Sequence, residues 1–274
     1  MKFNEKDRSL LLHLERAKES HGELREVLDF YGKLFHALFA FKSRLKLSPS
    51  ARSLEEKGVH SVFLIQGIPQ VTFEDLKMEE APWMDLYRAV MELLIPYMGL
   101  SQDGIEVPTA DRILQNAREI FESRGPLVGN EDPPELTRAA SGWTMAPFLQ
   151  LAWDSIMPQA NLASWHRGFC PLCGGRPSLA ALHGDSGRRL LHCPRCHGEW
   201  GFRRIGCPFC GGSDPQTYYS SEDGKYRLYL CPACKCYLKT VVLSESEGEV
   251  SLPVESLLTL PMDMAARAEG FRSG

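Results

Sequence analysis

The chain has 274 residues, of which 43% are hydrophobic and 24% are charged, and its formal net charge is −4. This composition excludes fibrous and intrinsically disordered classes, and the length allows two domains of moderate size. The N-terminus, MKFNEKDRSLLLHLER, mixes acidic with basic residues and lacks a long apolar core, and no uncharged stretch reaches the roughly 18 residues that a membrane helix needs. We therefore expect a cytoplasmic protein without membrane insertion.

The first 165 residues have the periodicity of α-helices. Apolar side chains recur at three- and four-residue steps in residues 23–45 and again in residues 83–98. Pro96 is expected to bend or end the second of these helices. Residues 141–157 are apolar on more than one face, which favours a buried core helix over an exposed docking surface.

A shorter helix is predicted over residues 109–123. Thr109 can cap its free N–H groups, and the acidic Asp111 favours the first turn. Residues 124–136 then form a Gly- and Pro-rich connector.

All nine cysteines lie between Cys170 and Cys236. Without an export signal, closely spaced cysteines indicate metal binding rather than disulfides. Residues 1–165 carry 18 Lys and Arg against 24 Asp and Glu, whereas residues 166–240 carry 11 against 5. A metal ion held by four thiolates has a charge of about −2, so much of the basic excess can compensate the charge of the sulfurs.

Eight of the cysteines form four Cys-x-x-Cys pairs. Two such pairs complete a tetrahedron around zinc or iron, and three ways of combining the four pairs are possible. Distance alone does not exclude a nested scheme in which the middle pairs share one ion. An internal repeat favours the scheme in which neighbouring pairs combine in chain order. Residues 170–196 and 207–234 share a CPxCGG opening, two strand-like runs around a Gly-containing turn, and a closing CPxC. Each repeat therefore predicts a β-hairpin with a metal knuckle at the base of its strands, followed by a third strand.

These motifs resemble those of a known family, the formate dehydrogenase accessory proteins (FdhE). The residues that carry the resemblance are WHRGFCPLCGGRP, RLLHCPRCHGEWGFRRIGCPFCGG, YLCPACKCYLKT and the closing MDMAARAEGFRSG. The resemblance implies an α+β fold with an all-α N-terminal domain at residues 1–165. Two tandem rubredoxin-like or zinc-ribbon modules would follow at 166–205 and 206–250, and a C-terminal helical tail at 251–274.

The resemblance also implies two bound metal ions, with iron reported for the family and zinc as the alternative that the same geometry allows. The expected ligands are Cys170, Cys173, Cys193 and Cys196 at the first site, and Cys207, Cys210, Cys231 and Cys234 at the second. The implied role is that of a non-enzymatic maturation chaperone in the cytoplasm. It would bind the catalytic subunit of a respiratory formate dehydrogenase before twin-arginine export.

Four residues near the pairs need a separate interpretation. Cys236 lies just beyond the last pair, where we expect a small residue, often Gly, and we favour a space-filling thiol over a redox role. His166, His192 and His197 are expected to be structural, because eight thiolates already complete both sites.

Two other non-enzymatic functions stay open. A tandem zinc-ribbon protein could bind nucleic acid through its arginines, although the acidic helical half and the net charge make this hypothesis weaker. The arginines are Arg188, Arg189, Arg195, Arg203, Arg204 and Arg227. An electron carrier with two irons is the third hypothesis. An enzyme is the weakest, because the sequence has no Gly-rich phosphate loop, no order of residues that suggests a catalytic triad and no three-ligand metal site.

Overall fold

The structure is a computed structural model that describes residues 3–45, 49–78, 82–103, 105–127, 135–184, 187–213 and 217–274. Its contacts divide the chain into two compact units, one of Met1–Val59 with Val71–Gln159 and the other of His60–Gln70 with Ala160–Gly274. The predicted boundaries after residues 165, 205 and 250 stay predictions. The grouping of residues 60–70 with the C-terminal unit has no counterpart in the sequence analysis.

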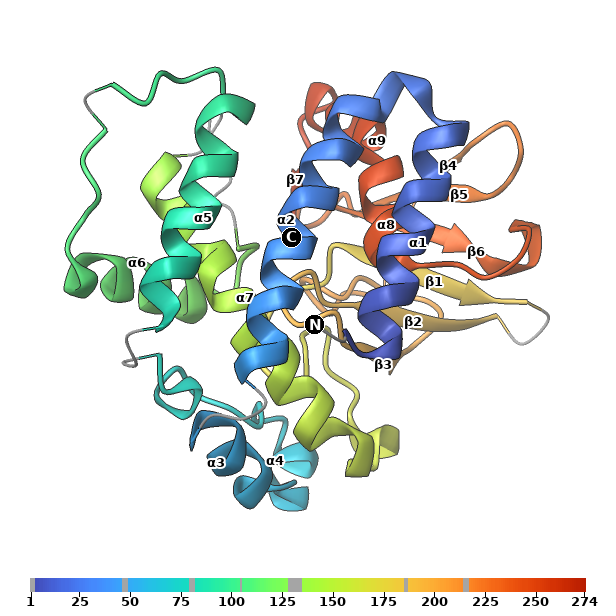
Figure 1. Cartoon of the computed structure of the whole chain (residues 1–274). Helices are drawn as coiled ribbons and strands as arrows, with labels where there is room; N and C mark the ends of the chain where they lie inside the picture. The colour runs from blue at the N-terminus through green and yellow to red at the C-terminus, as the bar shows by residue number, and fades with distance from the viewer. Residues whose placement is uncertain are drawn as a thin grey trace. The chain divides into compact units, whose positions relative to one another are not determined.

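The first unit is helical, and Figure 1 shows its helices from blue to yellow-green. They are α1 (Glu5–Ser20), α2 (Arg25–Leu45), α3 (Pro49–Lys57), α5 (Pro82–Tyr97), α6 (Ala110–Ser123) and α7 (Leu136–Ile156). Helix α7 is buried without interruption over residues 139–152, and α2, α3, α5 and α6 all pack against it. The sequence interpretation of this segment as a core helix is confirmed.

The ends of two helices follow the local signals. The Thr109 hydroxyl accepts a hydrogen bond from the backbone N–H of Arg112 at 3.4 Å, and Asp111 lies in the first turn of α6. Pro96 is the penultimate residue of α5, so this helix ends as predicted. Most of the predicted connector at 124–136 lies outside the described residues.

A buried ion triad joins three helices of this unit. Lys42 on α2 is 3% exposed, and its ammonium group donates to Asp7 on α1 at 2.7 Å and to Asp154 on α7 at 3.1 Å. Because Asp7 is also buried, each charge depends on its partners for solvation.

The second unit is built on one sheet with the strand order β3-β2-β1-β6-β5-β4, and it also contains α4 (Ser61–Gln66). Its strands are β1 (Leu179–His183), β2 (Arg188–His192), β3 (Glu199–Phe202), β4 (Thr217–Ser220), β5 (Tyr226–Leu230), β6 (Cys236–Val242) and β7 (Arg272–Ser273). Each sequence repeat forms an antiparallel meander, with β2 between β1 and β3 and with β5 between β4 and β6. Both predicted hairpins and both third strands are therefore present, although the turn residues 185 and 186 lie outside the described chain.

The two meanders join through a parallel pair. Strand β1 of the first repeat runs parallel to β6 of the second, with Leu179 opposite Lys239. Across the sheet, the strands of the first repeat follow one another as β3, β2, β1 and those of the second as β6, β5, β4. Strand direction alternates in the same way in both repeats. The two repeats thus lie side by side in the same orientation, and both sets of knuckles lie at the same end of the strands.

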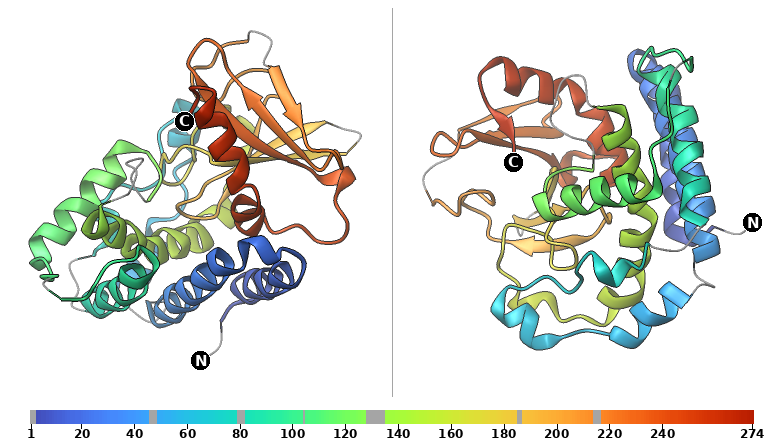
Figure 2. Two further views of the ribbon diagram at one scale, coloured as in Figure 1. Left: turned by 90° about the horizontal axis from the view of Figure 1, so that it is seen from above. Right: turned by 90° about the vertical axis from the view of Figure 1, so that its left-hand side faces the viewer.

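One face of this sheet is covered by two helices near the C-terminus, α8 (Leu252–Leu258) and α9 (Leu260–Ala268), drawn in red in Figure 2. Leu252 of α8 packs on Leu179 and Val241, and Ala266 of α9 packs on Leu228 and Tyr237. The α+β fold class, with helices first and a sheet bearing two four-cysteine clusters second, is confirmed.

Candidate metal centres

All four Cys-x-x-Cys pairs adopt one backbone conformation. In each, the N–H of the first cysteine donates to the carbonyl five residues later, and the N–H four residues later donates back to the carbonyl of that cysteine. These eight hydrogen bonds measure 2.8–3.0 Å and start from Cys170, Cys193, Cys207 and Cys231. Because both cysteines lie in one tight turn, their sulfurs point to the same side, which the short spacing requires.

The residue that closes each turn has a positive φ. It is glycine in the opening pairs, with φ of 70° at Gly174 and 72° at Gly211. In the closing pairs His197 and Lys235 hold the same left-handed conformation, with φ of 57°. A residue with a side chain is strained there, so these two positions hold a conformation that glycine adopts more easily.

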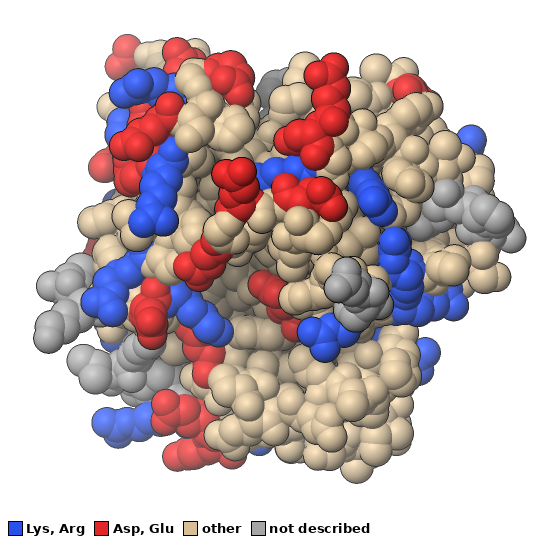
Figure 3. All heavy atoms as spheres, turned by 90° about the vertical axis from the view of Figure 1, so that its right-hand side faces the viewer, with Lys and Arg blue, Asp and Glu red and all other residues tan. Residues whose placement is uncertain are grey.

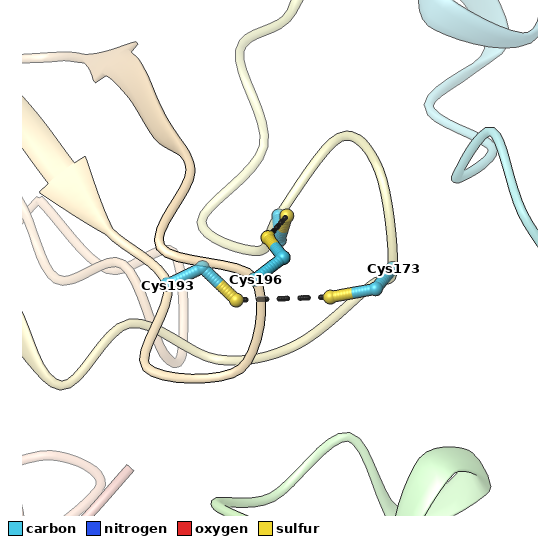
Figure 4. A group of neighbouring side chains, drawn as sticks. Cys173, Cys193 and Cys196 are labelled. Atoms are coloured by element: carbon cyan, nitrogen blue, oxygen red, sulfur yellow. Dashed lines mark hydrogen bonds between the residues drawn. The ribbon is translucent and has the colours of Figure 1, made fainter. Parts of the chain in front are cut away.

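The first centre is formed by two loops that face each other at the base of β1 and β2. Figure 4 shows the sulfurs of Cys173 and Cys193 facing each other; they lie 3.7 Å apart, and those of Cys170 and Cys196 lie 3.6 Å apart. All four sulfurs are within 4.8 Å of one another, and no cysteine of this centre is more than 3% exposed.

The second centre repeats this arrangement at the base of β4, β5 and β6. The sulfurs of Cys207 and Cys234 lie 3.7 Å apart, and those of Cys210 and Cys231 lie 3.8 Å apart. It is more open than the first, because Cys210 is exposed and Cys234 is partly exposed.

The spacing of the sulfurs suits a tetrahedral ion. With a metal–sulfur distance of about 2.3 Å, the edges of the tetrahedron measure about 3.8 Å, close to the distances in both clusters. Each cluster can therefore hold one metal ion. The structure brings the cysteines together in the two groups that the repeat predicts, while their role as metal ligands stays a prediction at this point.

The electrostatics of the first centre also suit a cation. Burial raises the pKa of Cys170 and of Cys196 well above the ordinary value, whereas hydrogen bonds from the other three thiols hold the pKa of Cys173 well below it. The side chain of Arg195 is fully buried nearby and its positive charge adds to the lowering at Cys173. A divalent cation would displace the remaining protons, and Arg195 would offset part of the negative charge that is left.

Cys236 lies outside both clusters. It occupies the fifth position after Cys231, which is Gly175, Gly198 and Gly212 in the other three turns. Its thiol is 3% exposed and lies 3.6 Å from the carbonyl oxygen of Cys234.

The three histidines near the pairs also lie outside the two clusters. His192 is 1% exposed, and burial lowers its pKa to about 3, so it is neutral. His197 closes its turn through its backbone, and its ring lies 5.8 Å from that of His192. His166 lies instead beside a hollow between Arg167 and Arg203.

The structure also gives two arginines a role that the sequence did not suggest. Arg189 on β2 is 1% exposed and donates to the carbonyl of Gly206, directly before Cys207, at 3.0 Å. Arg203 donates to the carbonyl of Gly211 within the second knuckle. Both side chains therefore support the backbone that leads into the second centre.

Comparisons with known proteins agree with this architecture. No family model matches the chain. A protein FdhE homolog from Pectobacterium carotovorum is 29% identical over 199 residues, which span 69% of this chain and 62% of that relative. A second match, to the FdhE homolog from Pectobacterium atrosepticum, likewise covers only 63% of its length. A third homolog, from Aquifex aeolicus, is 23% identical over 98% of this chain and 94% of its own.

The fold matches a solved structure. The crystal structure of the FdhE protein from Pseudomonas aeruginosa superposes with a TM-score of 0.58 over 98% of this chain and 92% of that one, at 20% identity. This likeness shows that the fold is shared, and the curated relatives carry the same family name. The chain is therefore similar in sequence to proteins named FdhE homologs and shares the fold of an FdhE protein.

Proposed function

We propose that the protein binds one metal ion in each cysteine cluster and acts as a non-enzymatic accessory protein in the maturation of a formate dehydrogenase. The observation that carries the metal proposal is the pair of four-sulfur clusters with contacts of 3.6–3.8 Å. The accessory role is supported by the similarity to proteins named FdhE homologs. In this role the protein binds the catalytic subunit of the enzyme in the cytoplasm, before twin-arginine export.

The ions would hold the strand ends of the second unit together. The ligands are Cys170, Cys173, Cys193 and Cys196 at the first centre and Cys207, Cys210, Cys231 and Cys234 at the second. Zinc would supply only structural cross-linking, whereas iron would add a one-electron couple. Because the opening and closing pairs of each centre come from different loops, loss of an ion frees both loops and weakens the sheet that presents the binding surface.

Two matched substitutions test this proposal. Cys193→Ser should reduce the metal content from two ions to one by emptying the first centre, and Cys231→Ser should do the same at the second. Cys236→Ser is the control and should keep both ions. Metal analysis of each purified variant, with its visible absorption spectrum, gives the number of ions and distinguishes iron from zinc.

The partner is tested separately with the same variants. The wild-type protein should retain the catalytic subunit of a formate dehydrogenase in a pull-down, and each metal-depleted variant should retain less. Full retention by a variant that lacks both ions would refute a metal-dependent binding surface. Recovery of DNA or RNA without formate dehydrogenase would favour the nucleic-acid hypothesis.

The charge distribution gives little support to nucleic-acid binding. On the face of the protein drawn in Figure 3, described acidic and basic side chains both occur, with uncharged surface between them. Two of the six candidate arginines, Arg189 and Arg203, are engaged with backbone carbonyls of the second unit. A nucleic-acid interface would instead need a continuous basic surface and a steep dependence of affinity on salt.

One observation favours electron transfer as a second candidate function. Cys210 is exposed, so an ion in the second centre would lie close to solvent and to a docked redox partner. Iron in this centre with a reversible potential and rapid reduction by a rubredoxin reductase would support this alternative. A zinc-loaded protein from the native host would exclude it, because zinc has no redox couple.

A further inference from the structure

Strand β4 leaves one edge of the sheet without a partner. It pairs with β5 and has no second neighbour among the described strands. All four of its residues are exposed, with Tyr218 at 48% and Tyr219 at 52%. Natural sheets usually protect such an edge with lysine, proline, a bulge or a covering segment, and TYYS contains no charged residue and no proline. An unprotected aromatic edge is a surface on which another strand can add.

The register of β4 shows which backbone groups are available. The N–H of Ser221 donates to the carbonyl of Tyr226 at 3.0 Å, while the carbonyl of Lys225, directly before β5, accepts from the N–H of Val242 on β6, on the other side. In an antiparallel pair the bonded residues alternate. The N–H and C=O groups of Tyr218 and Ser220 therefore point away from β5, into the open edge.

The two faces beside this edge differ in chemistry. On the face covered by α9, a groove of about 290 Å³ is lined mainly by apolar side chains. Its lining includes Tyr219, Leu228, Leu258, Pro261 and Met262. An apolar side chain of an added strand would enter this groove.

The opposite face of the edge is basic and aromatic. The guanidinium of Arg227 lies 5.1 Å from the ring centre of Tyr218, and Arg204 donates to the hydroxyl of Tyr229 at 3.4 Å. Among the described residues neither arginine forms an ion pair, although Glu245 attracts Arg227 from a greater distance. A carboxylate on an added strand would meet Arg227 beside Tyr218, whereas the Arg204 side chain reaches toward Gly187 next to β2.

We infer that the β4 edge, formed by Thr217–Ser220 with the α9 groove and with Arg227, binds an extended segment of a partner protein in which acidic and apolar residues alternate. Backbone hydrogen bonds to Tyr218 and Ser220 supply affinity. The alternation supplies specificity, because successive side chains of a strand point to opposite faces. The inference does not depend on which protein supplies the segment.

A synthetic peptide tests this surface directly. The metal-loaded, full-length protein is titrated with the acetylated and amidated peptide ELEVELE, and binding is followed by calorimetry and by amide exchange. We expect saturable binding that slows exchange of the Tyr218 and Ser220 amides, which are open to solvent in the free protein. The peptide EELVLEE has the same composition without the alternation and should bind at least about tenfold more weakly, since it loses about 1.4 kcal/mol or more. Equal binding of both peptides, or no protection of these amides, would overturn the inference.

Substitutions at the edge separate the three contributions. Ser220→Pro removes an outward N–H without breaking the bonds to β5, and should weaken the binding of ELEVELE by about tenfold or more. Ser220→Ala should change the affinity by no more than about twofold. Arg227→Gln should weaken the binding of this peptide by about fivefold. Ala265→Glu places a charge in the groove and should weaken binding. Met264 is 73% exposed on α9 and does not line the groove, so Met264→Glu should leave binding unchanged.

The oligomeric state gives the competing outcome. A dimer in solution that Ser220→Pro converts to a monomer would show that the edge pairs with a second copy of this chain, and would overturn the inference. Failure of the formate dehydrogenase pull-down would leave the peptide result standing, so the two proposals fail separately.

Discussion

The two centres should lose their ions in a fixed order when the metal-loaded protein is challenged with EDTA under native conditions. At the first centre the cysteines are 0–3% exposed, so a chelator can reach the ion only when the surrounding loops open. At the second centre Cys210 is exposed and Cys234 is partly exposed. The second ion should therefore leave first, and the protein should pass through a form with one ion.

The expected difference follows from the opening step. If exposure of the first centre requires a local opening of about 3 kcal/mol, its reaction is slowed about a hundredfold relative to an open site. Of the nine cysteines, alkylation with iodoacetamide should then modify Cys210 and Cys234 early. The buried cysteines of the first centre should react only after longer exposure, and Cys236, at 3% exposed, should also be protected.

The assay combines two measurements on the same samples. Released metal is quantified against time, and alkylated cysteines are mapped by peptide mass spectrometry, with urea-unfolded protein as the control in which all nine react. Equal rates at the two centres would refute the reasoning, as would earlier labelling of Cys170, Cys173, Cys193 or Cys196. Either result would mean that the burial of the first centre does not control access to its ion.

Three further predictions follow from individual residues. Lys42→Met leaves the buried Asp7 without its closest cation and should lower the free energy of unfolding in urea by about 3–5 kcal/mol; a loss below about 1 kcal/mol would contradict the buried triad. Gly211→Ala places a side chain on a backbone with φ of 72°, where the added Cβ meets no other atom, so it should lower stability by about 1 kcal/mol through backbone strain alone. Thermal melting measures this loss, and an unchanged melting temperature would argue against the left-handed turn. Cys236→Ala should retain both ions by metal analysis, and loss of the second ion would identify Cys236 as a ligand.

Much of the second unit follows from local sequence signals. A Cys-x-x-Cys turn closes within six residues, so the four knuckles and the hairpins between them are encoded over short distances, and the repeat shows their order. Aligning the four turns would also have found His197 and Lys235 at the positions that are Gly174 and Gly211 in the other two. In the first unit, the apolar residues on more than one face of α7 were enough to predict its burial.

The features that could not be predicted depend on contacts between distant residues. The parallel pair of β1 and β6 joins residues 179–182 to 239–242, and both strands are apolar runs that would suit many neighbours. Residues 60–70 group with the C-terminal unit, and there the backbone N–H of Gln70 donates to the carbonyl of Pro171 at 3.0 Å. Periodicity carries no information about such contacts, because they depend on where the rest of the chain has already folded.

The two nearly identical centres differ in burial and also in the segments that precede them. The first knuckle follows a strap, residues 165–169, held by two buried indoles: Trp165 donates to the carbonyl of Phe169 at 2.9 Å, and Trp200 donates to the carbonyl of Arg167 at 3.0 Å. The second knuckle follows only the short linker of residues 203–206, which Arg189 fixes by one hydrogen bond. Since the backbone turns are the same in both copies and the sulfur distances are similar, the different burial of the two clusters does not come from the turns themselves. The repeat thus provides one enclosed centre suited to holding the sheet together and one open centre suited to exchange with its surroundings.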